Sequence, residues 1–158
     1  MSHLPSLGRR GEGWVVIQFV LIGVVLIAGL AGPAWDGAAR VLGIVVGIGL
    51  VVAGAIQAVR GSRDLRDALT PLPYPRDDAM LVETGIYARV RHPIYGGIVI
   101  AAVGWGLATA SLAAFAATVG LWLFFEAKSR REEAWLAERF PGYAAYRDRT
   151  HRLTPWLG

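Results

Sequence analysis

The sequence predicts an all-α integral membrane protein with about four transmembrane helices, the last two forming a C-terminal helical hairpin beneath a cytoplasmic C-terminal lid. Hydrophobic residues make up 54% of the 158 positions. They are concentrated in four stretches that are almost free of charge, whereas a soluble domain of this length would alternate polar and apolar residues throughout. No strand pattern is evident between these stretches, so helices are expected throughout.

The four apolar stretches are residues 14–31, 41–59, 94–108 and 112–125. A helix needs about 20 residues to cross a bilayer, so the third and fourth stretches are short. The third helix gains length by starting at Pro93, and the fourth by continuing past Glu126 into a part that leaves the bilayer. Residues 109–111 then form a tight turn between the two helices.

The first apolar stretch has the alternative of being a secretory signal, because Arg9 and Arg10 precede it. Its length of 18 residues exceeds the roughly 7 to 15 of a signal core. Trp14 and Trp35 bracket it at about one bilayer thickness, as interfacial anchors do. We therefore expect a retained helix.

The charge distribution predicts the topology. Of the 16 basic residues only Arg40 lies in the first loop and none in the loop at 109–111, while the N-terminus, the segment 60–91 and the chain after Phe125 hold the rest. By the positive-inside rule both termini and the middle segment are cytoplasmic, as in a protein of the inner membrane. Acidic residues interleave with the arginines, so we expect no nucleic acid partner. The chain has no cysteine, which excludes disulfides and thiolate chemistry.

The chain is expected to form a single domain over residues 1–158. Its parts are two N-terminal helices at 14–59, a cytoplasmic connector at 60–93, the hairpin at 94–126 and a cytoplasmic segment at 127–158. The second stretch contains a pattern of small residues that allows close helix contact, formed by Gly43, Gly47, Gly49 and Gly54. We expect these glycines to serve packing within the bundle, with a homo-oligomer through this helix as the alternative.

Polar chemistry is confined to two blocks, residues 83–97 and 126–156, which flank the hairpin. Because the turn folds the third helix back along the fourth, His92 and the pair Glu132–Glu133 are expected at the same membrane face. Pro93 suits the first turn of a helix, which places His92 just before it. Gly96 and Gly97 remove side-chain bulk there, and we expect this to make room for a ligand.

Each of these groups also has a structural interpretation. Arg89 and Arg91 suit contacts with lipid phosphates, and His92 suits a helix cap. The glutamate pair suits an exposed helix surface paired with arginines. Tyr143 and Tyr146, after the helix break at residues 141–142, suit a belt at the membrane interface. The combination of these residues, rather than any one of them, points to a site.

That combination resembles the isoprenylcysteine carboxyl methyltransferase family and the related membrane phospholipid N-methyltransferases. The segment "GIYARVRHPIYGG" is similar to their G-x-Y-x-x-x-R-H-P-x-Y-x-G signature, and "EEAWLAERFPGYAAYRDRTHRLTP" to their E-E-x-x-L-x-x-x-F, Y-x-x-Y and R-x-x-P elements. The matching residues are Gly85, Tyr87, Arg91, His92, Pro93, Tyr95, Gly97, Glu132, Glu133, Leu136, Phe140, Tyr143, Tyr146, Arg152 and Pro155. The first two helices carry no comparable signature.

The resemblance implies methyl transfer from S-adenosylmethionine to a lipophilic small molecule or lipid at the cytoplasmic membrane surface. It implies that the cofactor contacts Gly85, Tyr87, His92, Pro93, Tyr95, Gly97, Glu132 and Glu133, and that Glu133, Arg152 and Arg91 act in catalysis, without a metal. Arg152 and Arg91 suit a carboxylate acceptor that must be oriented, whereas Glu133 suits an ammonium that must lose a proton.

Within this interpretation O-methylation of the isoprenylcysteine type is favoured over phospholipid N-methylation, and the acceptor itself stays open. Two other functions remain as alternatives. A nicotinamide-dependent membrane reductase shares a related helical architecture, and a small membrane scaffold would use only the glycine-rich second helix for association. Membrane lipids are expected partners in every case.

Overall fold

The computed structural model describes residues 7–8, 10–65 and 80–154. In these residues the chain forms helices α1 (Glu12–Ala28), α2 (Gly37–Leu65), α3 (Pro93–Thr109), α4 (Leu112–Arg139) and α5 (Tyr143–Asp148), with a 3-10 turn η2 (Gly85–Ala88). The described part contains no strand, only an isolated bridge between Val90 and His151. The predicted all-α fold is confirmed.

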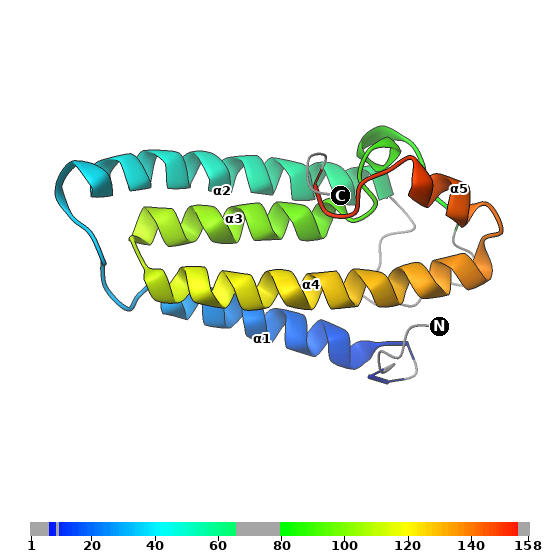
Figure 1. The fold of residues 1–158 in the computed structure, drawn as a ribbon, viewed down its shortest axis with the longest axis horizontal. Coiled ribbons are helices and arrows are strands. Elements are labelled where there is room, and N and C mark those ends of the chain that lie inside the picture. Colours follow the sequence, from blue (N-terminus) through cyan, green and yellow to red (C-terminus); the bar gives the residue numbers. More distant parts are fainter. Residues whose placement is uncertain (1–6, 9, 66–79, 155–158) are drawn as a thin grey trace.

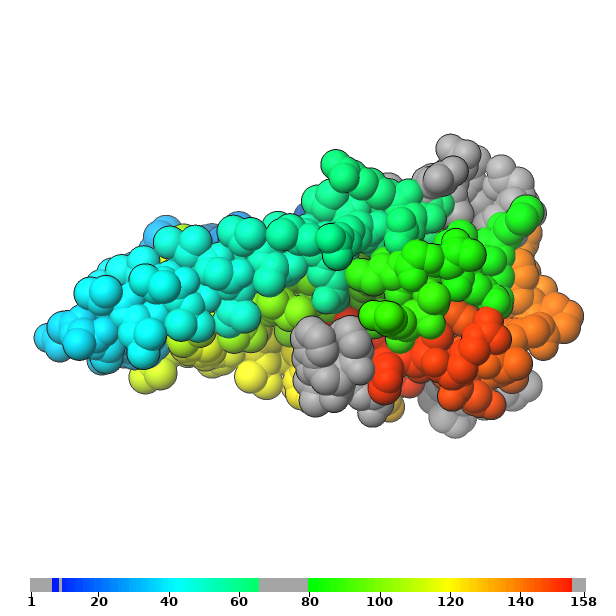
Figure 2. All heavy atoms as spheres, turned by 90° about the horizontal axis from the view of Figure 1, so that it is seen from above, coloured from blue at the N-terminus to red at the C-terminus, as the bar shows by residue number. Residues whose placement is uncertain are grey.

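The helices pack as two pairs joined by a hairpin. Helix α3 packs along α2, α1 packs along α4, and α3 and α4 contact each other in the middle of the bundle (Figure 1). Viewed from above, α2 runs along the length of the molecule, and the segment from residue 80 to 92 adjoins the C-terminal residues at one end (Figure 2). That end holds the polar blocks.

The hairpin turn lies where the sequence predicts it. Helix α3 ends at Thr109, Ala110 adopts a left-handed conformation with φ 53°, and Ser111 caps α4. The hydroxyl of Ser111 accepts a hydrogen bond from the Ala114 amide at 3.2 Å and donates one to the Ala28 carbonyl at 2.7 Å. The turn therefore also joins the end of α1 to the hairpin.

The glycines of α2 pack against α3. A Cβ at Gly47 would lie 2.5 Å from the carbonyl oxygen of Gly104, and one at Gly54 would lie 2.3 Å from that of Gly97. A Cβ at Gly49 would meet nothing within 4 Å. Packing within the bundle is confirmed for Gly43, Gly47 and Gly54 but not for Gly49, and the homo-oligomer stays a prediction.

Two described helices, α2 and α4, are long and apolar enough to cross a membrane by length and composition, and the shorter helices α1 and α3 are also apolar. Large hydrophobic side chains are exposed along α1, α2 and α4, among them Phe19, Ile27, Val45, Ile48, Leu112 and Leu123. A water-soluble monomer rarely exposes so much contiguous apolar surface. The four-span topology remains a prediction.

Two helix boundaries differ from the sequence prediction. Helix α2 continues to Leu65, inside the segment 60–93 expected to be a connector, and α1 ends at Ala28 rather than at residue 31. Hydropathy indicates where a helix would leave the bilayer, whereas backbone hydrogen bonds can continue into a polar segment, as they do in α2. In α1 the helix ends at Ala28, with Gly29 as its C-cap residue, before the apolar run does.

Candidate active site

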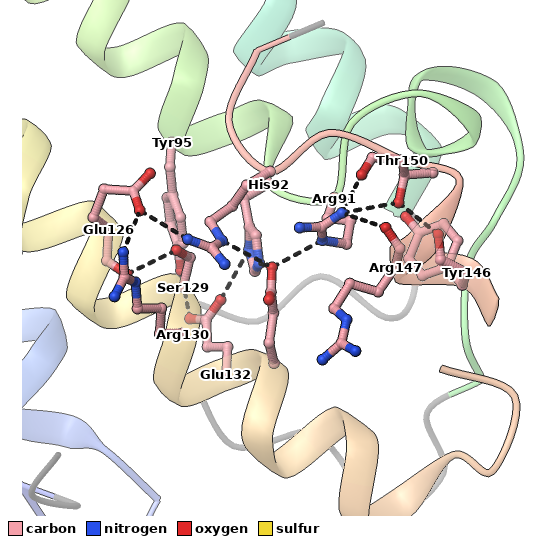
Figure 3. A network of polar contacts seen from close by, with 12 residues as sticks. Arg91, His92, Tyr95, Glu126, Ser129, Arg130, Glu132, Tyr146, Arg147 and Thr150 are labelled. Atoms are coloured by element: carbon pink, nitrogen blue, oxygen red, sulfur yellow. Dashed lines mark hydrogen bonds and ion pairs between the residues drawn. The ribbon is translucent and has the colours of Figure 1, made fainter. Parts of the chain in front are cut away.

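The candidate site lies where α3 begins, beside the polar part of α4 formed by residues 126–139 (Figure 3). His92 is the N-cap residue of α3, and Pro93 follows it in the first turn. The His92 side chain makes no capping hydrogen bond and is 8% exposed. The interpretation of His92 as a helix cap is therefore wrong for its side chain, which faces α4 instead.

The acidic pair on α4 surrounds the imidazole of His92. Nδ1 lies 3.3 Å from Oε2 of Glu132, and Nε2 lies 3.3 Å from Oε1 of Glu133. The Tyr95 hydroxyl donates a hydrogen bond to the other oxygen of Glu132 at 2.6 Å. Both carboxylates are largely buried, so the interpretation as an exposed helix surface is wrong.

Two arginines complete the surroundings of Glu133. Nε of Arg91 donates to Oε1 of Glu133 at 2.9 Å, and Nε of Arg152 approaches the same oxygen at 3.3 Å. Nη1 of Arg152 also donates to Oε2 of Glu126 at 2.8 Å. Glu133 therefore connects the start of α3, the C-terminal segment and α4.

The Arg91 side chain is 7% exposed, so the lipid-phosphate interpretation is wrong for this residue, while Arg89 is exposed. Besides Glu133, Arg91 donates through Nη1 to the carbonyl of Arg147 at 2.9 Å and to Thr150. A guanidinium engaged in this way positions Glu133 and the C-terminal segment. Arg152, whose side chain is 26% exposed, is more open to a ligand.

These contacts shift the acid–base behaviour of the site. Burial alone would raise the pKa of Glu133, but the contacts with His92 and Arg91 outweigh burial and lower it to about 2. Burial alone would lower the pKa of His92, but its contacts with Glu132 and Glu133 outweigh burial and raise it above the ordinary value. Glu133 is thus a carboxylate held in its ionised form.

The C-terminal segment, residues 143–154, covers the site and is hydrogen-bonded to the residues that precede α3. The amide of Arg91 donates to the His151 carbonyl at 2.8 Å, that of His92 donates to the Arg152 carbonyl at 2.8 Å, and the His151 amide donates to the Arg89 carbonyl at 2.9 Å. The predicted break after α4 is present, since the helix ends at Arg139. The predicted folding-back over the hairpin is confirmed for residues 143–154, while Pro155 and Trp156 lie outside the described residues.

Helix α5 packs inward rather than on a membrane interface. Tyr143 and Tyr146 are both buried, and the Tyr146 hydroxyl donates to the Tyr87 carbonyl at 2.8 Å. The interpretation of these tyrosines as an interfacial belt is wrong. Their burial fixes the C-terminal segment to the turn that precedes α3.

The glycines near the site allow close packing and an unusual backbone conformation. Gly85 has φ +62°, and a Cβ there would lie 2.2 Å from Oδ2 of Asp64, which accepts a hydrogen bond from the Ile86 amide. A Cβ at Gly96 would lie 1.9 Å from the Leu153 carbonyl oxygen, and Gly97 lies against α2. The expectation that Gly96 and Gly97 make room for a ligand is therefore wrong, because the backbone of neighbouring segments fills the space.

Two polar side chains that the sequence pattern did not single out lie directly behind the acidic pair. Lys128 is 1% exposed and donates to Oε1 of Gln18 on α1 at 2.6 Å. In the sequence, the only signs of this contact are that Gln18 is a lone amide in the apolar stretch 14–31 and that Lys128 lies at the start of the polar part of α4. No local pattern pairs these two residues, which are 110 positions apart.

The fold consists of long apolar helices, and a cluster of ionisable side chains is buried at its polar end. This combination is typical of a helical membrane protein with a catalytic centre at that end. The family model for phospholipid methyltransferases matches residues 42–142, well over half of the chain, and the chain belongs to this family. This is a family of membrane methyltransferases, whose members generally take their methyl group from S-adenosylmethionine. The match includes α2 from residue 42 onward, α3, α4 and the acidic pair, and it leaves out α1 and α5.

One curated relative is the cobalt-zinc-cadmium resistance protein CzcN of Cupriavidus metallidurans, which is 36% identical over 83 residues. The aligned region covers 52% of this chain and 38% of the relative. The chain thus spans well under half the length of that protein.

Proposed function

We propose that this protein transfers a methyl group from S-adenosylmethionine to a carboxylate at the polar end of a lipophilic acceptor. The family supports the reaction class. The position of the site supports the type of acceptor, because a polar cofactor from water and an apolar acceptor from the bilayer meet at the polar end of an apolar bundle. We infer that this end faces the cytoplasm in an inner membrane, with both termini on that side.

The residues at the site fit S-adenosylmethionine by their chemistry. The carboxylates of Glu132 and Glu133 suit a ligand that carries a sulfonium and an ammonium. Nε2 of His92 lies at ion-pair distance from Glu133, yet it makes no hydrogen bond of good geometry within the described residues, and neither does the buried hydroxyl of Tyr143. Buried polar atoms without hydrogen bonds are rare in folded proteins, and a polar ligand accounts for both.

We assign His92, Tyr95, Glu132 and Glu133 as the side chains that hold the cofactor, with the backbone at Gly85 and Tyr87 nearby. The bound cofactor supplies a methyl group activated by its sulfonium. The protein then has to align the acceptor with that methyl group and exclude water, which by itself accounts for much of the rate of such a displacement. Tyr95, Phe125 and the C-terminal segment bury the site and supply that exclusion.

The ion pairs of Glu133 are the observation that favours a carboxylate as the methyl acceptor. An ammonium acceptor needs a base, and a carboxylate whose pKa is about 2, paired with Arg91 and Arg152, is poorly matched to that role. A carboxylate acceptor is already a nucleophile at neutral pH and needs a cation to orient it. The partly exposed guanidinium of Arg152 suits this task.

The purified protein, incubated with radiolabelled S-adenosylmethionine and total membrane lipid, tests the proposal. Methyl esters are cleaved by mild alkali and release labelled methanol, whereas N-methyl and S-methyl groups retain the label. We expect alkali-labile label in the lipid fraction. Label that survives alkali would contradict O-methylation, and phospholipid N-methylation is the alternative that this result would favour.

Binding measurements separate the remaining alternatives. Thermal stabilisation in detergent by NADPH but not by S-adenosylhomocysteine would favour a reductase, and stabilisation by neither would favour a scaffold. Within the described part of the chain, no group of three or more His, Asp or Glu side chains is placed to hold a metal ion. The described residues therefore give no observation that favours a second, metal-related function of the kind that the relative's name indicates.

A further inference from the structure

A second polar contact lies behind the acidic pair, on the side of α1. Lys128 precedes Glu132 by four residues, which places both side chains on one face of α4, one helical turn apart. The Lys128 ammonium donates to Gln18 at 2.6 Å, and both side chains are buried. Through this contact α1 reaches the interior of the site.

The same ammonium contacts the ring that holds Glu132. Nζ of Lys128 lies 4.9 Å from the ring centroid of Tyr95, within the range of a cation–π contact. The Tyr95 hydroxyl donates to Glu132 at 2.6 Å, and its ring stacks on His92 and on Phe125 with centroid distances of 5.5 and 4.6 Å. A displacement of Lys128 would therefore shift the ring and the carboxylate together.

Packing alone does not account for this contact. Burying an ammonium costs free energy even when it is paired, and apolar side chains of similar volume often stabilise a core as well or better. The neighbouring positions on α1 that face α4 are apolar, such as Leu21 and Val25. A polar pair among them, in contact with the Tyr95 ring, indicates a role in the site.

We propose that Lys128, held by Gln18, is a positioning residue that fixes Tyr95 and Glu132 for cofactor binding, and that α1 is thereby part of the site. The proposal rests on the proposed function and goes beyond it. Gln18 lies outside the residues that the family model matches. The Lys128–Gln18 contact therefore joins α1 to the part of the chain that the family model matches.

Titration calorimetry with S-adenosylhomocysteine, on the full-length chain in detergent, tests the proposal. We expect Lys128→Met to weaken binding at least about tenfold, equivalent to 1.4 kcal/mol. Lys128→Arg should recover most of the loss, because it keeps the charge beside Tyr95 and a donor for Gln18. Arg60→Met removes a cation from an exposed position on α2 and serves as the matched control, with unchanged binding.

The double variant Gln18→Leu/Lys128→Met tests whether Gln18 acts through Lys128. If it does, Gln18→Leu weakens binding on its own but adds nothing to Lys128→Met, a non-additivity that independent structural roles would not produce. Thermal unfolding of every variant is measured alongside, and the double variant, which replaces both polar partners by apolar side chains, is expected to unfold at or above the temperature of Lys128→Met. If Lys128→Met does not fold, Gln18→Leu and Lys128→Arg decide the question.

The possible outcomes separate the two proposals. Wild-type binding with unaffected Lys128→Met and Gln18→Leu variants would overturn the positioning role alone. Losses that multiply in the double variant would overturn the link through Gln18. A wild-type chain that does not bind S-adenosylhomocysteine would overturn the proposed function, and the positioning role with it.

Discussion

At the scale of single residues, Glu133 is the side chain through which the histidine and both arginines of the site are connected. One of its oxygens is approached by Arg91 and His92, which are neighbours at the start of α3, and by Arg152 from the C-terminal segment. An ionised carboxylate in a largely buried position needs such partners, because an unpaired charge there would be strongly unfavourable. Glu133 therefore serves the architecture of the site as well as its chemistry.

Replacing Glu133 by Gln should leave Arg91 buried without its carboxylate partner. Breaking a buried ion pair from one side typically costs about 3 to 5 kcal/mol. We expect a lower unfolding temperature in detergent and at least a tenfold loss of turnover, about 1.4 kcal/mol of barrier. Glu138→Gln, an exposed glutamate on the same helix, is the control and should change neither quantity. Unaltered turnover in Glu133→Gln would contradict the assigned role.

The protonation of His92 predicts how stability depends on pH. Because the pKa of His92 is raised from 6.5, its contribution is fully present below 6.5 and is lost as the pH rises through the folded-state pKa. Because the pKa of Glu133 is lowered from 4.5 to about 2, its contribution is present above 4.5 and is lost on acidification towards 2. Stability should therefore be greatest between the two ranges.

Thermal unfolding in detergent, measured from about pH 4 to about pH 9, checks this expectation. The unfolding temperature of the wild-type chain should fall on the alkaline side, and His92→Gln should remove that fall. His151→Gln changes an exposed histidine and should keep the wild-type profile. A profile in which His92→Gln retains the alkaline fall would show that another group is responsible.

At the scale of elements, the contact between α2 and α3 determines where the site lies. Glycines on both helices let the backbones approach closely, with the carbonyls of Gly54 and Gly97 each facing the other helix. This contact places the start of α3, and with it His92, against the end of α2. Gln57 on α2 adds a hydrogen bond to the Pro93 carbonyl at 3.1 Å.

Two glycine-to-alanine variants on α2 should have effects of opposite sign. At Gly54 the new Cβ would lie 2.3 Å from the Gly97 carbonyl oxygen, so the helices must separate, at a typical cost of about 1 to 3 kcal/mol. At Gly49 the Cβ meets nothing within 4 Å, and alanine gains about 0.5 to 1 kcal/mol through its helix preference. Chemical unfolding in detergent measures both, and equal effects would contradict the close contact seen here.

The C-terminal segment is the second element on which the site depends. Deleting residues 143–158 removes α5, Arg152 and the carbonyls that pair with residues 91 and 92. We expect membrane insertion to be retained and both cofactor binding and methyl transfer to be lost. Arg152→Ala in the full-length chain separates the guanidinium from the rest of the segment and should lower turnover at least about tenfold. Turnover in the truncated chain would show that the segment is dispensable.

At the scale of the whole molecule, helix lengths indicate how the bundle would lie in a bilayer. Helix α4 has 28 residues and is about 42 Å long at 1.5 Å per residue, which exceeds the roughly 30 Å of a hydrocarbon core. Its apolar part begins at the hairpin turn, and its charged part starts at Glu126. The acidic pair therefore stands beyond the apolar layer, level with the C-terminal segment.

Single cysteines in this cysteine-free chain test the topology. Ser2→Cys and Thr109→Cys should be labelled from opposite sides of the membrane by a reagent that cannot cross it, with position 109 accessible from outside. The unaltered chain is the control and should take up no label, since it has no thiol. Labelling of both positions from one side would contradict the arrangement with cytoplasmic termini and an external hairpin turn.

The sequence by itself determined the features that depend on neighbouring residues. Runs of apolar side chains located the helices, Pro93 marked the start of α3, and residues 109–111 and 141–142 marked the turn and the break. These signals are local because they act through hydropathy and through the backbone limits of proline and glycine. The charged blocks that flank the hairpin then predict that His92 and the acidic pair lie together, since a hairpin brings its two ends to the same face.

Only the tertiary structure decided which side chains are partners. The tie between Arg91 and the C-terminal segment, the pairing of Gln18 with Lys128 and the fit of Gly85 against Asp64 join positions far apart in the chain. Each depends on how the helices are rotated and spaced against one another. A pattern of apolar residues does not determine that rotation or spacing. The same arginine, lysine or glycine is compatible with a lipid-facing surface or a buried contact, and the neighbouring helix decides between them.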